Sequence, residues 1–192
     1  MNIFQEYREI ALQNGFLFDS MEDNKTFITP NDRILNTKYC FLSKNEIIYF
    51  ASDSYAAKVG MSSTYSGVYT ILPNNNSEFE VEITKRFWTD LFAKRNKLNN
   101  SFIDKNLTIK TNRVELLSRI IDVRVTENFL KLWKKYPPIK IIIGKDYLPF
   151  VASFKGKLII GIESNEWIMP KKFLTAFNDI QEFLVELKRK VD

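Results

Sequence analysis

The sequence predicts an α+β protein with a largely antiparallel sheet, an N-terminal helix, a central pair of helices and a long C-terminal helix. Two observations lead to this prediction. Short apolar runs are separated by turn residues, as in hairpins, which pair strands antiparallel. The later half is predicted as β-α-β-α-α-β-β-β-α, without the regular alternation that favours a parallel sheet. With 192 residues, 45% of them hydrophobic, the chain can bury a core without metal or disulfide.

The first element expected is a helix over residues 2–13, because its apolar residues recur at helical spacing and Asn14-Gly15 supplies the stop. Short strands are expected next in the sequences GFLF, KTFITP, KYCFL and EIIYFAS. The segment FLSKNEIIYF is interpreted as a hairpin with a four-residue connection. A further strand, TYSGVYTIL, precedes a predicted loop at residues 73–78, PNNNSE.

That loop is the predicted boundary between two lobes, residues 1–76 and residues 77–192, with a single compact domain as the alternative. Charge supports the division. Residues 1–84 carry 11 acidic and 6 basic side chains, whereas residues 85–192 carry 12 acidic and 22 basic ones. The first lobe is therefore acidic and the second basic. A basic half can meet nucleic acid, anionic lipid or an acidic protein, and two oppositely charged lobes can also attract each other.

In the later half, EFEVEITKRF alternates apolar and acidic residues, which predicts a strand with Glu78, Glu80 and Glu82 on its outer face. A short helix through WTDLFAKRN and the strand LTIKT are expected to follow. A helix in NRVELLSRIID is expected to be capped by Asn112, whose side chain can accept from free amides of the first turn. The next helix, VTENFLKLWKKY, is expected to end at the proline pair that begins with Pro137.

The apolar runs IKIIIG and KLIIGIE predict central strands. FVASF is interpreted as another strand, joined to KLIIG by a tight turn at Lys155-Gly156. The last helix is expected after Pro170, with an apolar stripe that continues for five turns.

Histidine is absent, which removes the usual general base near neutral pH and the commonest metal ligand. Catalytic triads and Cys-His nucleophile systems are therefore excluded within this chain, as are zinc sites of thiolate and imidazole. The single cysteine, Cys40, excludes an internal disulfide and is expected to be a small buried thiol. No glycine-rich phosphate loop or dinucleotide fingerprint occurs. We assign no catalytic residue, no metal ligand and no cofactor.

Carboxylate and lysine chemistries remain open. The three glutamates of EFEVEITKRF could collect a hard cation, but solvation or pairing with lysines across the sheet is the preferred interpretation. Asp146, Glu163 and Glu166 lie near the ends of expected strands and could converge as a carboxylate pair, although their spacing is not diagnostic.

The helix VTENFLKLWKKY turns its apolar residues inward and leaves a lysine-rich side for a partner. A second basic segment, residues 85–113, holds eight Lys and Arg against two acids and interleaves them with aromatic residues. Cations and aromatic rings together suit single-stranded nucleic acid, but no nucleic-acid-binding module is recognisable. The candidate binding residues are Arg124, Lys131, Lys134, Lys135, Lys94, Arg95 and Lys97.

The stretch from FEVEITKRFWTDLF through NLTIKTNRVELLSRII to LPFVASFKGKLIIGIESNEW resembles uncharacterised bacterial proteins that share a domain of unknown function. The resemblance covers about residues 78–190. It implies a strand-helix lead-in, a strand containing IKTN, a helix pair and a closing meander, and it implies no catalytic residue. Some relatives attach this domain to membrane helices, whereas no apolar run here approaches the roughly 20 residues that a membrane crossing needs.

Together these features favour a non-catalytic binding or accessory protein that meets an acidic protein partner through the basic surface of its later half. Nucleic-acid binding is a less favoured alternative, and a histidine-independent enzyme using carboxylates or lysine is another. We expect a cytoplasmic protein, because the amphipathic N-terminal segment does not resemble an export signal and a chain without disulfides fits a reducing compartment. The sequence does not predict the oligomeric state.

Overall fold

The computed structural model describes residues 3–28, 34–56, 61–73, 78–92, 95–136, 138–145 and 151–191. Its elements in chain order are α1 (Ile3–Asn14), β1 (Leu17–Ile28), β2 (Ile34–Lys44), β3 (Ile47–Ala56), β4 (Met61–Ile71), β5 (Val81–Lys85), the 3₁₀ helix η1 (Trp88–Phe92), α2 (Ser101–Asn106), β6 (Leu107–Thr111), α3 (Val114–Ile120), α4 (Val123–Lys135), β7 (Ile139–Lys145), the 3₁₀ helix η2 (Ala152–Phe154), β8 (Leu158–Ser164) and α5 (Pro170–Val191).

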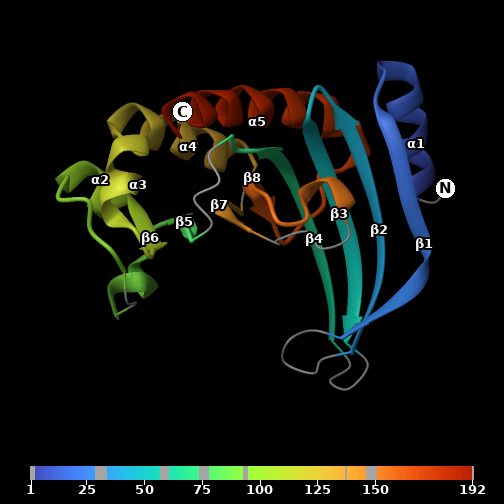
Figure 1. The fold of residues 1–192 in the computed structure, drawn as a ribbon, viewed down its shortest axis with the longest axis horizontal. Helices are drawn as coiled ribbons and strands as arrows, with labels where there is room; N and C mark the ends of the chain where they lie inside the picture. The colour runs from blue at the N-terminus through green and yellow to red at the C-terminus, as the bar shows by residue number, and fades with distance from the viewer. Residues whose placement is uncertain are drawn as a thin grey trace.

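Within these described ranges, eight strands form one antiparallel sheet in the order β1-β2-β3-β4-β8-β7-β5-β6. Figure 1 shows α5, in red, running along one side of the sheet, with α1 next to β1 and α2 next to β6 at the opposite end. The expected α+β class, with its N-terminal helix, central helix pair and long C-terminal helix, is confirmed. Because β4 pairs with β8, strands from both sides of the predicted lobe boundary share this sheet; residues 74–77 of the boundary lie outside the described ranges.

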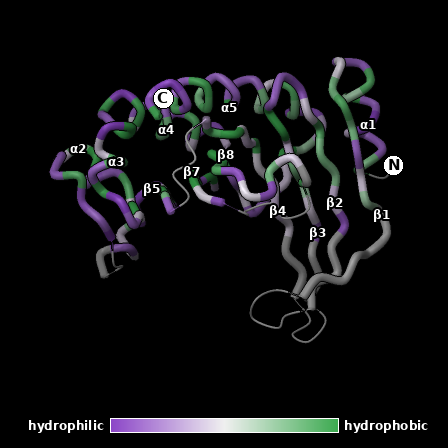
Figure 2. The backbone as a smooth tube through the Cα atoms, viewed as in Figure 1, coloured by the Kyte–Doolittle hydropathy of each residue, from purple (hydrophilic) through white to green (hydrophobic). Residues whose placement is uncertain are grey.

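One face of the sheet packs against the helices and forms the larger core. Alternate residues of the central strands are buried together with one side of α5. Figure 2 shows hydrophobic and hydrophilic residues following each other along α5, as expected for a helix with one buried side. The predicted apolar stripe of α5, which runs from Phe173 to Val191 and includes Leu174, is confirmed except that Leu174 is exposed and Val191 is only partly buried. Its buried members include Phe173, Phe177, Ile180, Phe183, Leu184 and Leu187.

The first helix forms as expected. α1 ends at Asn14, and Gly15 follows with a positive φ of 70°, a conformation that glycine adopts without steric cost. Phe4, Tyr7 and Ala11 of this helix are buried in the larger core. Cys40 is also fully buried there, as expected from its apolar neighbours.

The opposite face of the sheet carries a second cluster, which includes Phe50, Tyr69 and Ile142 together with Val151 and Phe154 from the segment around η2. The predicted strand FVASF is therefore wrong. Its described residues form a 3₁₀ turn that inserts two apolar side chains into this cluster, and β7 pairs directly with β8. An apolar run alone cannot distinguish a strand from a short segment that covers a sheet face.

Tyr69 occupies this face because two neighbouring positions are glycine. Its ring lies across Gly67 and Gly161, and a Cβ atom at Gly161 would lie 2.6 Å from Cε1 of the ring. A Cβ atom at Gly67 would lie 2.7 Å from Cε2. The absence of both side chains therefore lets the Tyr69 ring lie flat on the strands and sets the direction of its hydroxyl group.

Two local predictions are corrected by the backbone. Lys44 pairs with Ile47, so the β2–β3 connection has two residues, Asn45 and Glu46, rather than four. Both have positive φ, 51° and 63°, which a two-residue type I′ turn requires; sequence reasoning missed it because glutamate is unusual there. In addition, residues 17–18 of GFLF and residues 25–28 of KTFITP belong to one strand, β1, with a register irregularity inside it, and the last two residues of KTFITP lie outside the described ranges.

Asn112 does not cap α3, so that prediction is also wrong. Its side chain instead accepts a hydrogen bond from the amide of Glu80 at 3.0 Å and donates one to the carbonyl of Glu78. The residue thus joins the end of β6 to the start of β5. In α4 the cap is Asp122, whose carboxylate accepts from the amide of Val125 at 2.8 Å. This cap explains why α4 begins two residues earlier than the predicted segment.

Candidate functional site

Four of the predicted binding residues lie on the exposed side of α4: Arg124, Lys131, Lys134 and Lys135. Two of them are paired with acids of α5. Nε of Arg124 lies 3.2 Å from Oε1 of Glu186, and the ammonium group of Lys135 forms an ion pair with Asp179. A groove of about 410 Å³ between α4 and α5 also includes Glu182 in its wall. Acids of α5 therefore balance much of the positive charge on this side of α4.

The other predicted binding residues come from the loop between η1 and α2. Lys97 is exposed, whereas Arg95 is half-buried and donates to the carbonyl of Asp104 at 2.6 Å. Lys94 lies outside the described residues. Arg95 thus has a structural hydrogen bond that holds this loop against α2.

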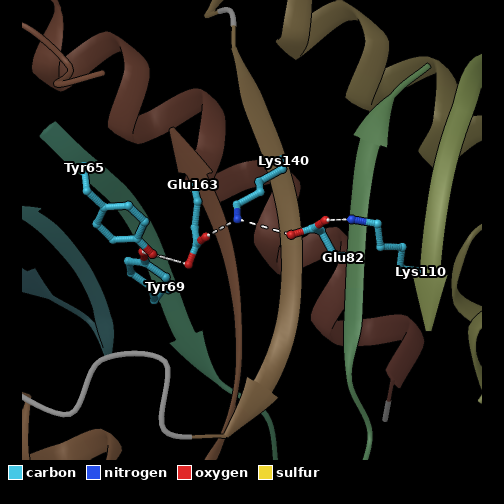
Figure 3. Close-up of polar contacts among 6 residues, drawn as sticks. All are labelled: Tyr65, Tyr69, Glu82, Lys110, Lys140 and Glu163. Carbon is cyan, nitrogen blue, oxygen red and sulfur yellow. Dashed lines mark hydrogen bonds and ion pairs between the residues drawn. The ribbon is translucent and has the colours of Figure 1, made fainter. Parts of the chain in front are cut away.

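A row of polar side chains crosses the sheet face opposite the helices (Figure 3). At its centre is Glu163 of β8, whose side chain is 1% exposed. The hydroxyl groups of Tyr65 and Tyr69 donate to Oε1 of Glu163, the second at 3.2 Å. Nζ of Lys140 on β7 lies 3.2 Å from Oε2. A buried carboxylate without partners is costly, and here both oxygen atoms have partners.

The row continues to the sheet edge through Glu82 of β5 and Lys110 of β6. Nζ of Lys140 lies 3.4 Å from Oε2 of Glu82, and Nζ of Lys110 lies 2.8 Å from Oε1. The strand registers explain the order of the side chains in this row, because Lys140 lies directly opposite Glu163 on the neighbouring strand, and Glu82 lies directly opposite Lys110. The predicted pairing of an outer-face glutamate with lysines across the sheet is confirmed. Two carboxylates and two ammonium groups alternate, so the row is neutral overall.

The ionisation of the row follows from these contacts. The hydrogen bond from Lys110 holds the pKa of Glu82 below its ordinary value, with further help from the charge of Lys140. Burial raises the pKa of Tyr69 well above its ordinary value, so its hydroxyl group stays a donor to Glu163. The two carboxylates of the row therefore fix the position of the Lys140 ammonium group between them.

Glu82 gives the protein a testable acid sensitivity. Because its folded-state pKa is depressed, its contribution to stability is present at neutral pH and is lost as the pH falls below about 4.3, the unperturbed value for glutamate. We expect the free energy of unfolding of the wild type to fall more steeply below about pH 5 than that of Glu82→Gln. Urea titrations over a pH series measure this difference. Parallel pH profiles for the two proteins would contradict it.

Two cavities open at the end of the sheet where β5 and β8 end and β7 begins. The apolar cavity has a volume of about 210 Å³, and its wall includes Ile162, Trp167, Ile168, Met169 and Ile180, with Tyr136, Lys135 and Lys172. The lysine cavity has a volume of about 170 Å³, and its wall includes Lys85, Lys140, Phe87, Trp133 and Pro138. Ile139, Glu163 and Ser164 line both. The two cavities are therefore adjacent.

Lys85 gives the lysine cavity its positive charge. Its ammonium nitrogen lies 3.9 Å from the ring centroid of Trp133 and 5.5 Å from that of Phe87. The two rings contact each other edge to face, with centroids 5.7 Å apart. Among the described residues no carboxylate lies within ion-pair distance of Lys85. Because the polar row is neutral, Lys85 supplies an uncompensated cation.

The wall of the apolar cavity is held by side chains from distant strands. In the segment between β8 and α5, the carbonyl groups of Asn165 and Glu166 accept from Thr64 and Ser66, each at 2.6 Å. The indole group of Trp167 donates to the carbonyl of Ser52 at 2.8 Å. This segment is thereby fixed at three successive residues, which holds the wall of the apolar cavity in place.

Tyr7 adds a further hydrogen bond to this wall, because its buried hydroxyl group donates to the carbonyl of Ile168 and lies 2.9 Å from the hydroxyl group of Tyr49. Replacement by phenylalanine keeps the ring contacts but leaves the partly buried carbonyl of Ile168 without this donor. We expect Tyr7→Phe to lower the free energy of unfolding by about 1–2 kcal/mol, measured by urea denaturation. A loss below about 0.5 kcal/mol would mean that Ile168 finds another donor.

The predicted carboxylate convergence is only partly described. Glu163 is buried in the polar row, Glu166 is exposed and also lines the apolar cavity, and Asp146 lies outside the described residues. In the ranges that the structure describes, no group of three or more Cys, Asp or Glu side chains is arranged to hold a metal ion. No described helix is long and apolar enough to cross a membrane.

Comparisons of this chain with protein-family models, curated proteins and solved structures found no match. The geometry of the described residues is therefore the basis for a functional proposal.

Proposed function

We propose that the protein acts by binding an acidic protein partner, and that its contact surface is the end of the sheet where the apolar and lysine cavities open side by side. The observation that carries the proposal is Lys85, a cation placed on two aromatic rings without a carboxylate partner in the described structure. A cation of this kind attracts a negative group from outside the chain. We also propose a cytoplasmic setting, which the lack of an internal disulfide supports.

The size of the cavities supports a protein partner. Their volumes, about 210 and 170 Å³, are each smaller than the roughly 300–1,000 Å³ of typical small-molecule sites. Each therefore suits a side chain that projects from a larger molecule.

The composition of the surrounding surface gives independent support. Trp88 is 81% exposed, and Phe87 and Met169 are also exposed. Large aromatic side chains and methionine are enriched at protein interfaces. Lys172 lines the apolar cavity and Lys134 follows Trp133 in α4, so further cations lie in the same elements.

Selection of random peptides against the immobilised protein tests the proposal. We expect the selected peptides to be enriched in Asp and Glu, and their binding to weaken with salt, because the attraction is between opposite charges. The double variant Lys85→Glu/Lys172→Glu, which reverses one lysine of each cavity, is expected to lose this enrichment. A matched variant, Lys155→Glu/Lys157→Glu, reverses two exposed charges that line neither cavity and is expected to retain it.

Two outcomes would contradict the proposal. Selection of neutral peptides would show that charge does not direct binding. Tighter binding of single-stranded oligonucleotides than of any acidic peptide, with a steep dependence on salt, would assign the surface to nucleic acid instead.

A further inference from the structure

We infer that the two cavities bind neighbouring side chains of one partner segment: an acidic side chain enters the lysine cavity and pairs with Lys85, while an apolar side chain enters the apolar cavity. This inference rests on the proposed function and specifies its ligand. The shared wall of Ile139, Glu163 and Ser164 places the two cavities within reach of one short segment.

Electrostatics assign the acidic side chain to the lysine cavity. Glu163, Lys140, Glu82 and Lys110 alternate in sign and neutralise one another along the polar row. Lys85 remains as the excess charge at this cavity. A carboxylate that pairs with Lys85 therefore makes the site neutral, whereas an apolar or cationic side chain leaves it charged.

The surroundings of Lys85 strengthen such a pair. Trp133 and Phe87 cover part of the ammonium group and replace water beside it. The attraction between opposite charges increases as water is excluded, so a carboxylate gains more here than at a fully exposed lysine. Rings on two sides also restrict the directions from which an anion can approach.

Lys140 provides a second donor on the same wall. Its ammonium group has three N–H donors, and the described contacts to Glu163 and Glu82 account for two acceptors. Its side chain is 30% exposed and lines the lysine cavity, so a donor is available to the second oxygen of an incoming carboxylate. The lysine cavity thus offers one uncompensated cation, Lys85, and one further N–H donor, Lys140.

A carboxylate fits this cavity better than a phosphate group. Glu163 lines the same wall and, at 1% exposure, cannot move its charge into water. A phosphate group carries nearly two negative charges at neutral pH and would meet stronger repulsion from Glu163 than a carboxylate does. The structure therefore favours Asp or Glu in the partner segment.

The apolar cavity supplies the second half of the recognition. Ile162, Trp167 and Met169 lie in its wall, and the hydrogen bonds of the 165–169 segment fix the positions of that wall. An apolar side chain gains affinity from a pocket that needs no rearrangement, because little conformational entropy is lost on binding.

The test is a double-mutant cycle between the protein and a defined peptide. The probe is the tightest-binding acidic peptide from the selection described above, synthesised with a fluorescent label, and its affinity is measured by fluorescence anisotropy. Lys85→Met in the protein removes the ammonium group and keeps an unbranched apolar side chain. Glu→Gln or Asp→Asn in the peptide removes the carboxylate charge at one position at a time.

We expect Lys85→Met to weaken binding about tenfold or more, and one peptide amide substitution to weaken it equally, with little further loss when both are combined. Lys85→Arg should restore part of the affinity, and Lys155→Met, at an exposed lysine outside both cavities, should leave it unchanged. Replacement of one neighbouring apolar residue of the peptide by alanine should also weaken binding. A phosphoserine at the acidic position should bind less tightly than glutamate.

Additive losses in the cycle would overturn the inference, because Lys85 would then not contact the acidic side chain. Equal or tighter binding of the phosphoserine peptide would overturn the assignment of a carboxylate. In both cases the wild-type protein still binds the acidic peptide, so the proposed function stands. Failure of the wild type to select any acidic peptide would remove the proposed function itself.

Discussion

Replacement of Lys140 by methionine is expected to lower the free energy of unfolding by about 2–3 kcal/mol. The substitution removes the cation that lies 3.2 Å from Glu163 and leaves a carboxylate that is almost fully buried without its counter-charge. Removing one partner of a fully buried pair costs about 3–5 kcal/mol, and the effect here is smaller because Lys140 itself is partly exposed. Urea denaturation at neutral pH measures the change.

A second substitution separates the loss of charge pairing from loss of packing. In Lys140→Met/Glu163→Gln, the buried side chain is neutral and can still accept from Tyr65 and Tyr69. We expect the double variant to recover more than half of the stability that Lys140→Met loses. If the double variant is less stable than either single variant, the unpaired charge of Glu163 is not the cause of the loss in Lys140→Met. Lys131→Met is the matched control, because Lys131 is exposed, and should change stability little.

Replacement of Gly161 by alanine is expected to destabilise the protein by about 3 kcal/mol, since overpacking of a dense core costs about 1–3 kcal/mol and here displaces an entire ring. The new methyl group would lie 2.6 Å from Cε1 of Tyr69, which is fully buried. The ring cannot shift freely, because its hydroxyl group donates to Glu163 and lies 2.6 Å from the hydroxyl group of Tyr65. A thermal or urea unfolding measurement gives the size of the effect.

A variant that lacks the Tyr69 ring can test why Gly161→Ala destabilises the protein. In Tyr69→Ala, the space above Gly161 is vacant, so adding Gly161→Ala should cost little more. If Gly161→Ala costs as much in this background as in the wild type, the steric conflict with Tyr69 is not the reason for the loss. The cycle therefore tests the close approach of Tyr69 to the strands directly.

Local sequence patterns predicted the elements whose periodicity matches their burial. The alternation of Val81 and Ile83 in β5 and the long apolar stripe of α5 are of this kind, because a single buried face imposes its period on the residues. The errors fell where another contact determined the local structure. Asn112 bonds to the start of β5 rather than capping a helix, and Phe154 anchors a turn in the second apolar cluster.

The candidate site depends even more on contacts between residues that are distant in the sequence, which local patterns do not predict. Lys85 and Phe87 belong to the basic aromatic segment that the sequence singled out, but Trp133 lies on α4, far along the chain. Glu163 was recognised only as one of several acids near strand ends, and its pairing with Lys140 depends on the register between β7 and β8. Local spacing contains no information about this register, so the cavities could not be predicted, and of the polar row only the pairing of an outer-face glutamate with lysines could be.

The pairing of β4 with β8 has a consequence for dividing the chain. This seam joins six residue pairs, from Ser66 with Ser164 to Ile71 with Ile159. If the connection between β4 and β5 is cut, one fragment contains β4 and the other contains β8. The edges of these two strands pair over the same six positions in the intact sheet. We expect two such fragments, produced together, to reassemble into the intact sheet, which makes this connection a suitable point for a split reporter of the folded protein.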